Sequence, residues 1–116
     1  MYKMKKSSLG EARKCMEYIR DNIGECKGNE VYAMCNDAKK AVESARKKEK
    51  IKLEAMKGGK DEFSIRAIDI EDKIDIMGEI NIYIMDIILE VKKSVPKADL
   101  IVRRVDQAAR NIAVLQ

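Results

Sequence analysis

Apolar residues recur along most of the chain at alternating intervals of three and four, the spacing that keeps one face of an α-helix turned toward a neighbouring helix. The longest run on this spacing lies in the second half of the sequence: Phe63, Ala67, Ile70, Ile74, Met77, Asn81, Ile84, Ile88, Val91 and Val95. Three shorter runs share the spacing: Leu9, Ala12, Met16, Ile19 and Ile23; Val31, Cys35, Ala38, Val42, Ala45, Glu49, Lys52 and Met56; Ile101, Val105, Ala108, Ile112 and Leu115. The pattern therefore predicts four helices.

Residues that favour helix ends place the boundaries of these elements at about 8–24, 29–57, 63–95 and 99–115. Ser8 and Glu11 have the spacing of a capping box, in which the two side chains satisfy free backbone N–H groups at a helix start. Asn29 and Asp99 are suitable N-caps for the second and fourth helices, and Pro96 closes the third.

A β-strand is the alternative interpretation of residues 63–67, which alternate in polarity and include residues that favour strands. Ala67 and Ile68 break this alternation, whereas the helical spacing continues through both positions. The helix is therefore the preferred prediction.

Short connections between successive helices make them antiparallel neighbours, so we expect an all-α, up-down-up-down four-helix bundle in a single domain, residues 1–116. Apolar residues make up 46% of the chain and aromatic residues only 4%, which predicts an aliphatic core. Glu49 and Lys52 occupy stripe positions in the second helix, so we expect the second half of that helix to be loosely packed or to reach into solvent.

The chain contains no histidine, which removes the commonest general base and the imidazole metal ligand. We therefore expect a protein that is not an enzyme, with no catalytic residue, no metal site and no cofactor. Cys15, Cys26 and Cys35 lack CxxC spacing and are odd in number, which argues against a disulfide framework and favours a reducing compartment. They are interpreted as small apolar residues beside the core.

The chain shows no apolar segment typical of a signal peptide, and its longest uncharged apolar-rich run, residues 80–85, is too short to span a membrane. We expect a cytoplasmic protein without membrane contact.

Charge is unevenly distributed: residues 39–60 carry nine basic and three acidic side chains, and residues 61–90 carry two basic and nine acidic ones. Helical geometry aligns Lys39, Arg46, Lys50 and Lys57 away from the apolar stripe, with Lys40 and Lys47 beside them. The fourth helix adds Arg103, Arg104 and Arg110. These nine residues are the candidate nucleic-acid-binding set, because Lys and Arg neutralise phosphates. The alternative is an ordinary solvated, lysine-rich surface.

The third helix carries a line of carboxylates: Asp72, Asp75, Glu79, Asp86 and Glu90. Similar spacings bind metal ions in all-α nucleotide pyrophosphatases and ferritin-like proteins, but those sites face inward from at least two helices. This line lies opposite the apolar face, so a solvated surface is the preferred interpretation.

Additional isoleucines widen the apolar arc of the third helix beyond the width that a four-helix monomer needs. A central position in the fold would bury this surplus, and so would a subunit interface. We favour the interface and assign Ile76, Ile80 and Ile87 to it.

The order and lengths of the helices, the basic second helix, the Ile-rich third helix and the final segment Asp106-Gln-Ala-Ala-Arg-Asn-Ile112 resemble Avd, the accessory variability determinant of diversity-generating retroelements, and the related bundle proteins encoded in intervening sequences of ribosomal RNA genes. The chain departs from that family in lacking a Phe-Pro turn after the first helix and in ending Asn111-Ile-Ala-Val-Leu-Gln116 instead of in Gly-Gly-Trp. The resemblance implies a homo-oligomer, a pentamer if Avd-like, that binds RNA and a reverse transcriptase without catalysing a reaction. It transfers no individual site residue.

Three functional hypotheses follow. The preferred one is a non-enzymatic nucleic-acid-binding accessory protein, with RNA favoured as its ligand. The second is a protein–protein adaptor or inhibitor whose apolar surface binds another protein, and the third is an all-α nucleotide hydrolase that uses the carboxylates of the third helix.

Overall fold

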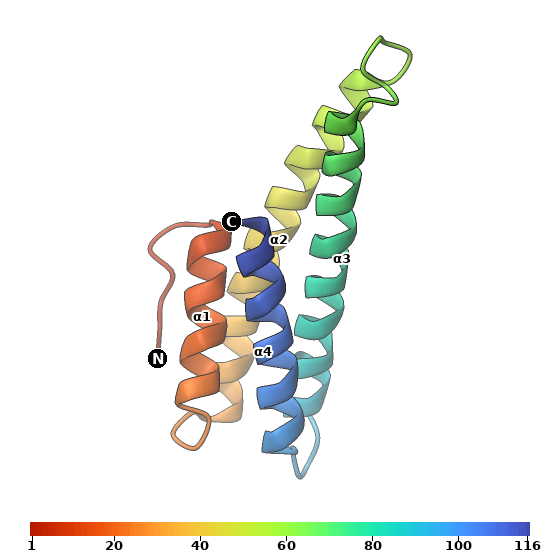
Figure 1. Ribbon diagram of the computed structural model, residues 1–116. Coiled ribbons are helices and arrows are strands. Elements are labelled where there is room, and N and C mark those ends of the chain that lie inside the picture. Colours follow the sequence, from red (N-terminus) through yellow and green to blue (C-terminus); the bar gives the residue numbers. More distant parts are fainter.

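The computed structural model describes residues 1–116 and contains four α-helices and no strand: α1 (Leu9–Asp21), α2 (Gly28–Met56), α3 (Ile65–Val91) and α4 (Ala98–Leu115). Each helix packs closely against the next in the chain, and α1 also packs against α4, while the backbones of the diagonal pairs lie farther apart. Figure 1 shows the alternating up and down course of the four helices. The predicted all-α, up-down-up-down four-helix bundle is confirmed.

The observed helix ends correct several predicted boundaries. Ser8 caps α1 as expected, and its hydroxyl accepts a hydrogen bond from the backbone N–H of Glu11 at 3.2 Å. The second helix begins one residue before Asn29, with Lys27 at its N-cap position. The third begins at Ile65, where the Ser64 hydroxyl accepts from Ala67 N at 3.2 Å, and the alternative strand at 63–67 does not form. Phe63 therefore precedes the helix and is 88% exposed.

The main core is built from all four helices and consists of aliphatic residues, methionines and two cysteines. The stripe residues supply most of it, including Ala12, Met16 and Ile19 from α1 and Ile101, Val105 and Ile112 from α4. Burial raises the pKa of Cys15 and of Cys35 to about 12, so both thiols stay protonated at neutral pH. The interpretation of Cys15 and Cys35 as small core residues is confirmed.

Two carboxylates are buried in the bundle, and each has a polar neighbour. Glu11 accepts a hydrogen bond from the hydroxyl of Tyr2, which ties the segment before α1 to the bundle. Glu90 is 1% exposed and lies 3.1 Å from Lys93 Nζ. Glu90 therefore does not belong to the solvated acidic line predicted for the third helix.

Two of the helices are much longer than their partners. The second and third helices have 29 and 27 residues, whereas α1 and α4 have 13 and 18. The excess length of α2 and α3 projects as a two-helix hairpin beyond the ends of α1 and α4 (Figure 1). We call residues 43–76 the arm. Only three of its residues, Ala67, Ile70 and Ile74, are buried, so the second half of α2 reaches into solvent as predicted.

No helix in this structure is both long enough and apolar enough to cross a membrane.

Candidate nucleic-acid interface

The predicted basic residues of α2 divide into two groups when their partners are considered. Lys39 Nζ lies 2.7 Å from Glu43 Oε1, and Lys57 Nζ lies 2.9 Å from Glu54 Oε2. The hydrogen bond to Glu54 also raises the pKa of Lys57. These two ammonium groups already have an anionic neighbour, which weakens their attraction for a phosphate.

Arg46 is directed across the bundle surface toward α3. Its Nε donates a hydrogen bond to the carbonyl oxygen of Ile74 at 3.1 Å, and its guanidinium lies against Gly78, where a side chain would leave no room for it. Arg46 therefore serves the contact between α2 and α3, and it also lines a shallow hollow with Lys47 and Lys50. Its place in one phosphate-binding line with Lys39, Lys50 and Lys57 stays a prediction.

Lys40, Lys47 and Lys50 remain as the exposed members of the predicted set on α2, and Lys48 joins them. None of the four has a carboxylate within 4.0 Å. Lys48 lies on an adjacent side of α2, outside the line that helical geometry predicts. At a rise of about 1.5 Å per residue, the four ammonium groups extend over roughly 15 Å, a length sufficient to contact several phosphates. We call these four residues the lysine surface.

The predicted arginines of α4 also differ from one another. Arg104 Nε lies 3.1 Å from Asp86 Oδ2, and its guanidinium lies over the ring of Tyr83, 5.8 Å from the centroid. Arg110 Nε lies 2.9 Å from Asp106 Oδ2. Both arginines therefore have acidic partners, and Arg104 also joins α4 to α3.

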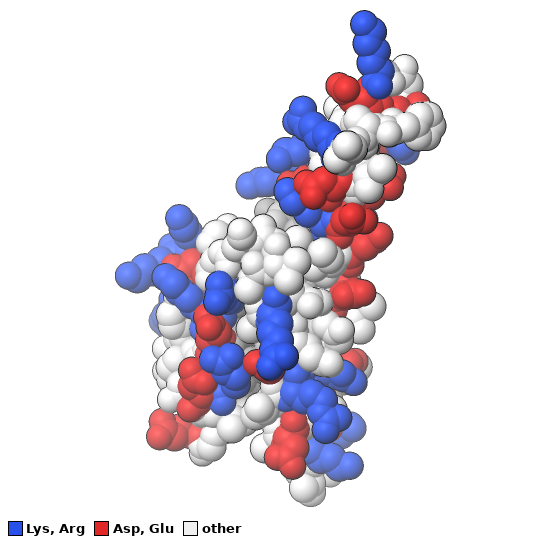
Figure 2. Space-filling model, in the orientation of Figure 1, with Lys and Arg blue, Asp and Glu red and all other residues white.

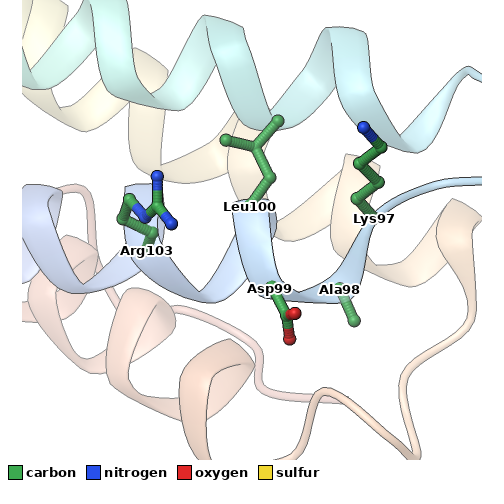
Figure 3. A pocket seen from close by; sticks show the side chains of 5 residues that line it. All are labelled: Lys97, Ala98, Asp99, Leu100 and Arg103. Carbon is green, nitrogen blue, oxygen red and sulfur yellow. The ribbon is translucent and has the colours of Figure 1, made fainter.

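Arg103 is exposed and lines a shallow hollow of about 530 Å³ at the start of α4, together with Lys97 and three neighbouring residues. Figure 3 shows Lys97 and Leu100 directed toward one side of α4 and Asp99 toward the other. This end of the bundle lies opposite the arm (Figure 1), so the structure does not bring Arg103 together with the lysine surface. The prediction of one site shared by α2 and α4 is therefore not supported by the geometry.

The predicted subunit interface on α3 needs a correction. Ile80 and Ile87 have no exposed surface and belong to the main core of the monomer, while Ile76 is half-buried and packs against that core. Ile80 and Ile87 are covered by the chain's own helices and are not available to a second subunit. The isoleucine surplus on α3 is instead exposed at Ile68 and Ile82.

The acidic side chains of α3 do not form a metal site, although Asp75, Glu79 and Asp86 line one open hollow with Arg46. Asp86 pairs with Arg104, and Glu79 accepts a hydrogen bond from Asn111 Nδ2 at 3.3 Å. No group of three Asp, Glu or Cys side chains lies close enough to hold a metal ion.

Most basic and most acidic side chains of the arm lie on opposite sides, although Lys52, Lys57 and Lys73 each pair with a carboxylate. Figure 2 shows Lys and Arg side chains on the side that overhangs the ends of α1 and α4, and Asp and Glu side chains along the opposite edge. This separation creates a positive field on one side of the arm, which favours the approach of an anionic ligand from that side.

Comparison of the chain with protein-family models, with curated proteins and with solved structures finds no match.

Proposed function

We propose that this protein is a non-enzymatic nucleic-acid-binding accessory protein that contacts the phosphate backbone through the lysine surface of α2. The observation that carries the proposal is that Lys40, Lys47, Lys48 and Lys50 are exposed and have no carboxylate partner. When unpaired ammonium groups neutralise phosphates, they displace the counterions condensed on the nucleic acid. This release is the main source of sequence-independent affinity.

The resemblance to Avd favours RNA as the ligand. It also suggests a homo-oligomer, a pentamer if Avd-like, and a reverse transcriptase as the protein partner. Exposed aromatic side chains do not alternate with the lysines, so the surface is suited to backbone contacts and not to stacking on bases.

The test compares the wild-type chain with the Lys47→Gln/Lys50→Gln variant in binding to a fluorescent single-stranded RNA, measured by anisotropy across a salt series. Glutamine has nearly the helix propensity of lysine, so the helix should persist. Loss of two phosphate contacts should lower the slope of log affinity against log salt by about 1.4. Lys27→Gln/Lys97→Gln removes the same charge at the opposite end of the bundle and serves as the control. Equal binding by the two variants would contradict a site on α2.

A protein–protein adaptor is the second candidate, and a specific feature of α3 favours it. Ile82, Met85 and Leu89 are 61%, 38% and 55% exposed and follow one another at intervals of three and four. They form one apolar line on the outer side of the helix, which could accept the apolar face of a partner helix. An adaptor of this kind would show no salt-dependent affinity for RNA.

A further inference from the structure

The face of α3 that packs against α4 continues into the arm with a change of residue type. Ile87 and Ile80 are fully buried in the core, and the next two positions at the same interval of seven are Lys73 and Arg66. An interval of seven keeps residues on nearly the same side of a helix. In the bundle, α4 packs against this side of α3 and the side is apolar. In the arm, Lys73 and Arg66 occupy the same side.

The second helix also changes from buried apolar residues in the bundle to basic residues in the arm at intervals of seven. Met34 and Ala41 are buried in the core, and the next position at an interval of seven is Lys48. Val31 and Ala38 are likewise buried and are followed by Ala45 and then by Lys52.

The contacts between α3 and α4 show at which residue of α3 the packing of α4 against it ends. Asp86 contacts Arg104, and Glu79 contacts Asn111, so each step along α3 toward the arm is matched by a step toward the end of α4. The fourth helix ends at Leu115, which places Lys73 and Arg66 beyond it. Arg66 is exposed, and the side chain of Lys73 is 42% exposed.

Arg66 and Lys73 are the only basic residues between positions 61 and 90, a segment with nine acidic side chains. Both fall on this one face. Asp69 lies 3.3 Å from Lys73 Nζ, and Glu49 lies 3.3 Å from Lys52 Nζ, which leaves Arg66 and Lys48 without a carboxylate partner.

We propose that Arg66 of α3 joins Lys48 of α2, with the paired Lys73 and Lys52 beside them, to form a two-helix phosphate-binding face on the inner side of the arm. This inference rests on the proposed function and extends it from one helix to two. Packed helix axes lie about 8–10 Å apart, and one heptad rises about 10 Å, so the four cations share a compact area. Arg66 and Lys48 have no carboxylate partner, and the phosphates of a nucleic-acid strand that crosses the face would supply the missing negative charge.

The test uses the full chain and the same single-stranded RNA, with the salt concentration varied from about 50 to about 200 mM. Arg66→Gln/Lys73→Gln should lower the salt slope by about 0.7 and weaken binding at about 0.1 M salt by roughly 5-fold, which is the value for one lost contact on a single strand, because Lys73 already pairs with Asp69. The Lys27→Gln/Lys97→Gln control should keep the wild-type slope. Circular dichroism should show unchanged helix content for both variants, because the substituted side chains are exposed.

The outcomes separate this inference from the proposed function. If Lys47→Gln/Lys50→Gln weakens binding and Arg66→Gln/Lys73→Gln does not, the face on α3 is refuted and the proposed function stands. If the wild-type chain shows no salt-dependent RNA binding, both are refuted. If polyglutamate competes as well as an RNA of equal charge, the face is assigned to acidic protein segments and the inference is overturned.

Discussion

The guanidinium of Arg46 on α2 lies over Gly78 on α3, so closely that a methyl group at position 78 would come within 2.9 Å of Arg46 Nη2. The same guanidinium donates through Nε to the carbonyl of Ile74. Glycine in the middle of a helix normally lowers stability relative to alanine. Its presence here gives Arg46 the room to cross from one helix to the other at the base of the arm.

This contact predicts coupling between the two positions. In a chain that carries Arg46→Ala, Gly78→Ala should stabilise the fold by about 1 kcal/mol, the usual gain in helix propensity. In the wild-type chain the same change must displace Arg46 and disturb its hydrogen bond, which is worth about 1 kcal/mol, so the gain should nearly vanish. Urea unfolding of the four chains measures the coupling. Equal gains in both backgrounds would mean that Arg46 moves aside without loss.

Ile80 and Lys73 lie one heptad apart on α3 but on opposite sides of the boundary between core and arm. Ile80→Asp should unfold the chain, because it places an unpaired charge in the core at a cost of several kcal/mol. Lys73→Asp should remain folded and lose less than about 1 kcal/mol, mostly from its pair with Asp69.

Circular dichroism and sedimentation measure the two outcomes for Ile80 and Lys73. A folded Ile80→Asp monomer derived from a wild-type oligomer would show that Ile80 lies in a subunit interface after all.

The three cysteines should react with a thiol reagent in a definite order. Cys26 is half-buried and its pKa is raised chiefly by desolvation, whereas burial raises the pKa of Cys15 and Cys35 to about 12. We expect one fast thiol at pH 8 and two that react only on unfolding, since the thiolate is the reactive form. Cys26→Ser should remove the fast phase, and fast labelling of two thiols in that variant would contradict the packing of α1 against α2.

The raised pKa values of Cys15 and Cys35 also determine how the free energy of unfolding changes with pH in the alkaline range. A raised pKa in the folded state means that the folded chain holds its thiol protons more tightly than the unfolded chain does. The resulting stability is fully present below the ordinary thiol pKa of 9.0 and is lost as the pH rises from there toward 12. Urea unfolding between these limits should show a steeper loss of stability in the wild-type chain than in a Cys15→Ala/Cys35→Ala chain.

Arg103 and Arg104 are adjacent in sequence and differ in role. Arg104→Ala should lower the free energy of unfolding by about 1–2 kcal/mol, because it removes the contacts to Asp86 and Tyr83 between α3 and α4. Arg103→Ala should change it by less than about 0.5 kcal/mol, since the side chain is exposed. Thermal unfolding of the two variants tests the difference, and equal effects would remove Arg104 from the contact between these helices.

The sequence by itself determined the four helices and the residues that form most of the core. Spacings of three and four leave one face per helix that must be buried, and every helix except α3 has only one such face. The cap at Ser8 was also predictable, because serine favours helix starts in any fold. The end of the third helix was predicted wrongly at Pro96, since α3 already ends at Val91.

Tertiary structure alone decided which side of α3 is covered. Isoleucines occur on several sides of this helix between Ile76 and Leu89, so periodicity could not separate the buried Ile80 and Ile87 from the exposed Ile82. Only the positions of α2 and α4 make that choice. The charged stripe positions Glu49 and Lys52 and the unequal helix lengths already indicated a solvent-exposed arm.

The candidate nucleic-acid interface was likewise predictable only in part from the sequence. Charge counts located a basic segment on α2, but the availability of each cation depends on the atoms around it. Arg46 and Arg104 act in contacts between helices, which only their tertiary neighbours reveal. The heptad positions of Lys73 and Arg66 were visible in the sequence, but their exposure became apparent only when α4 was seen to end before it reaches them.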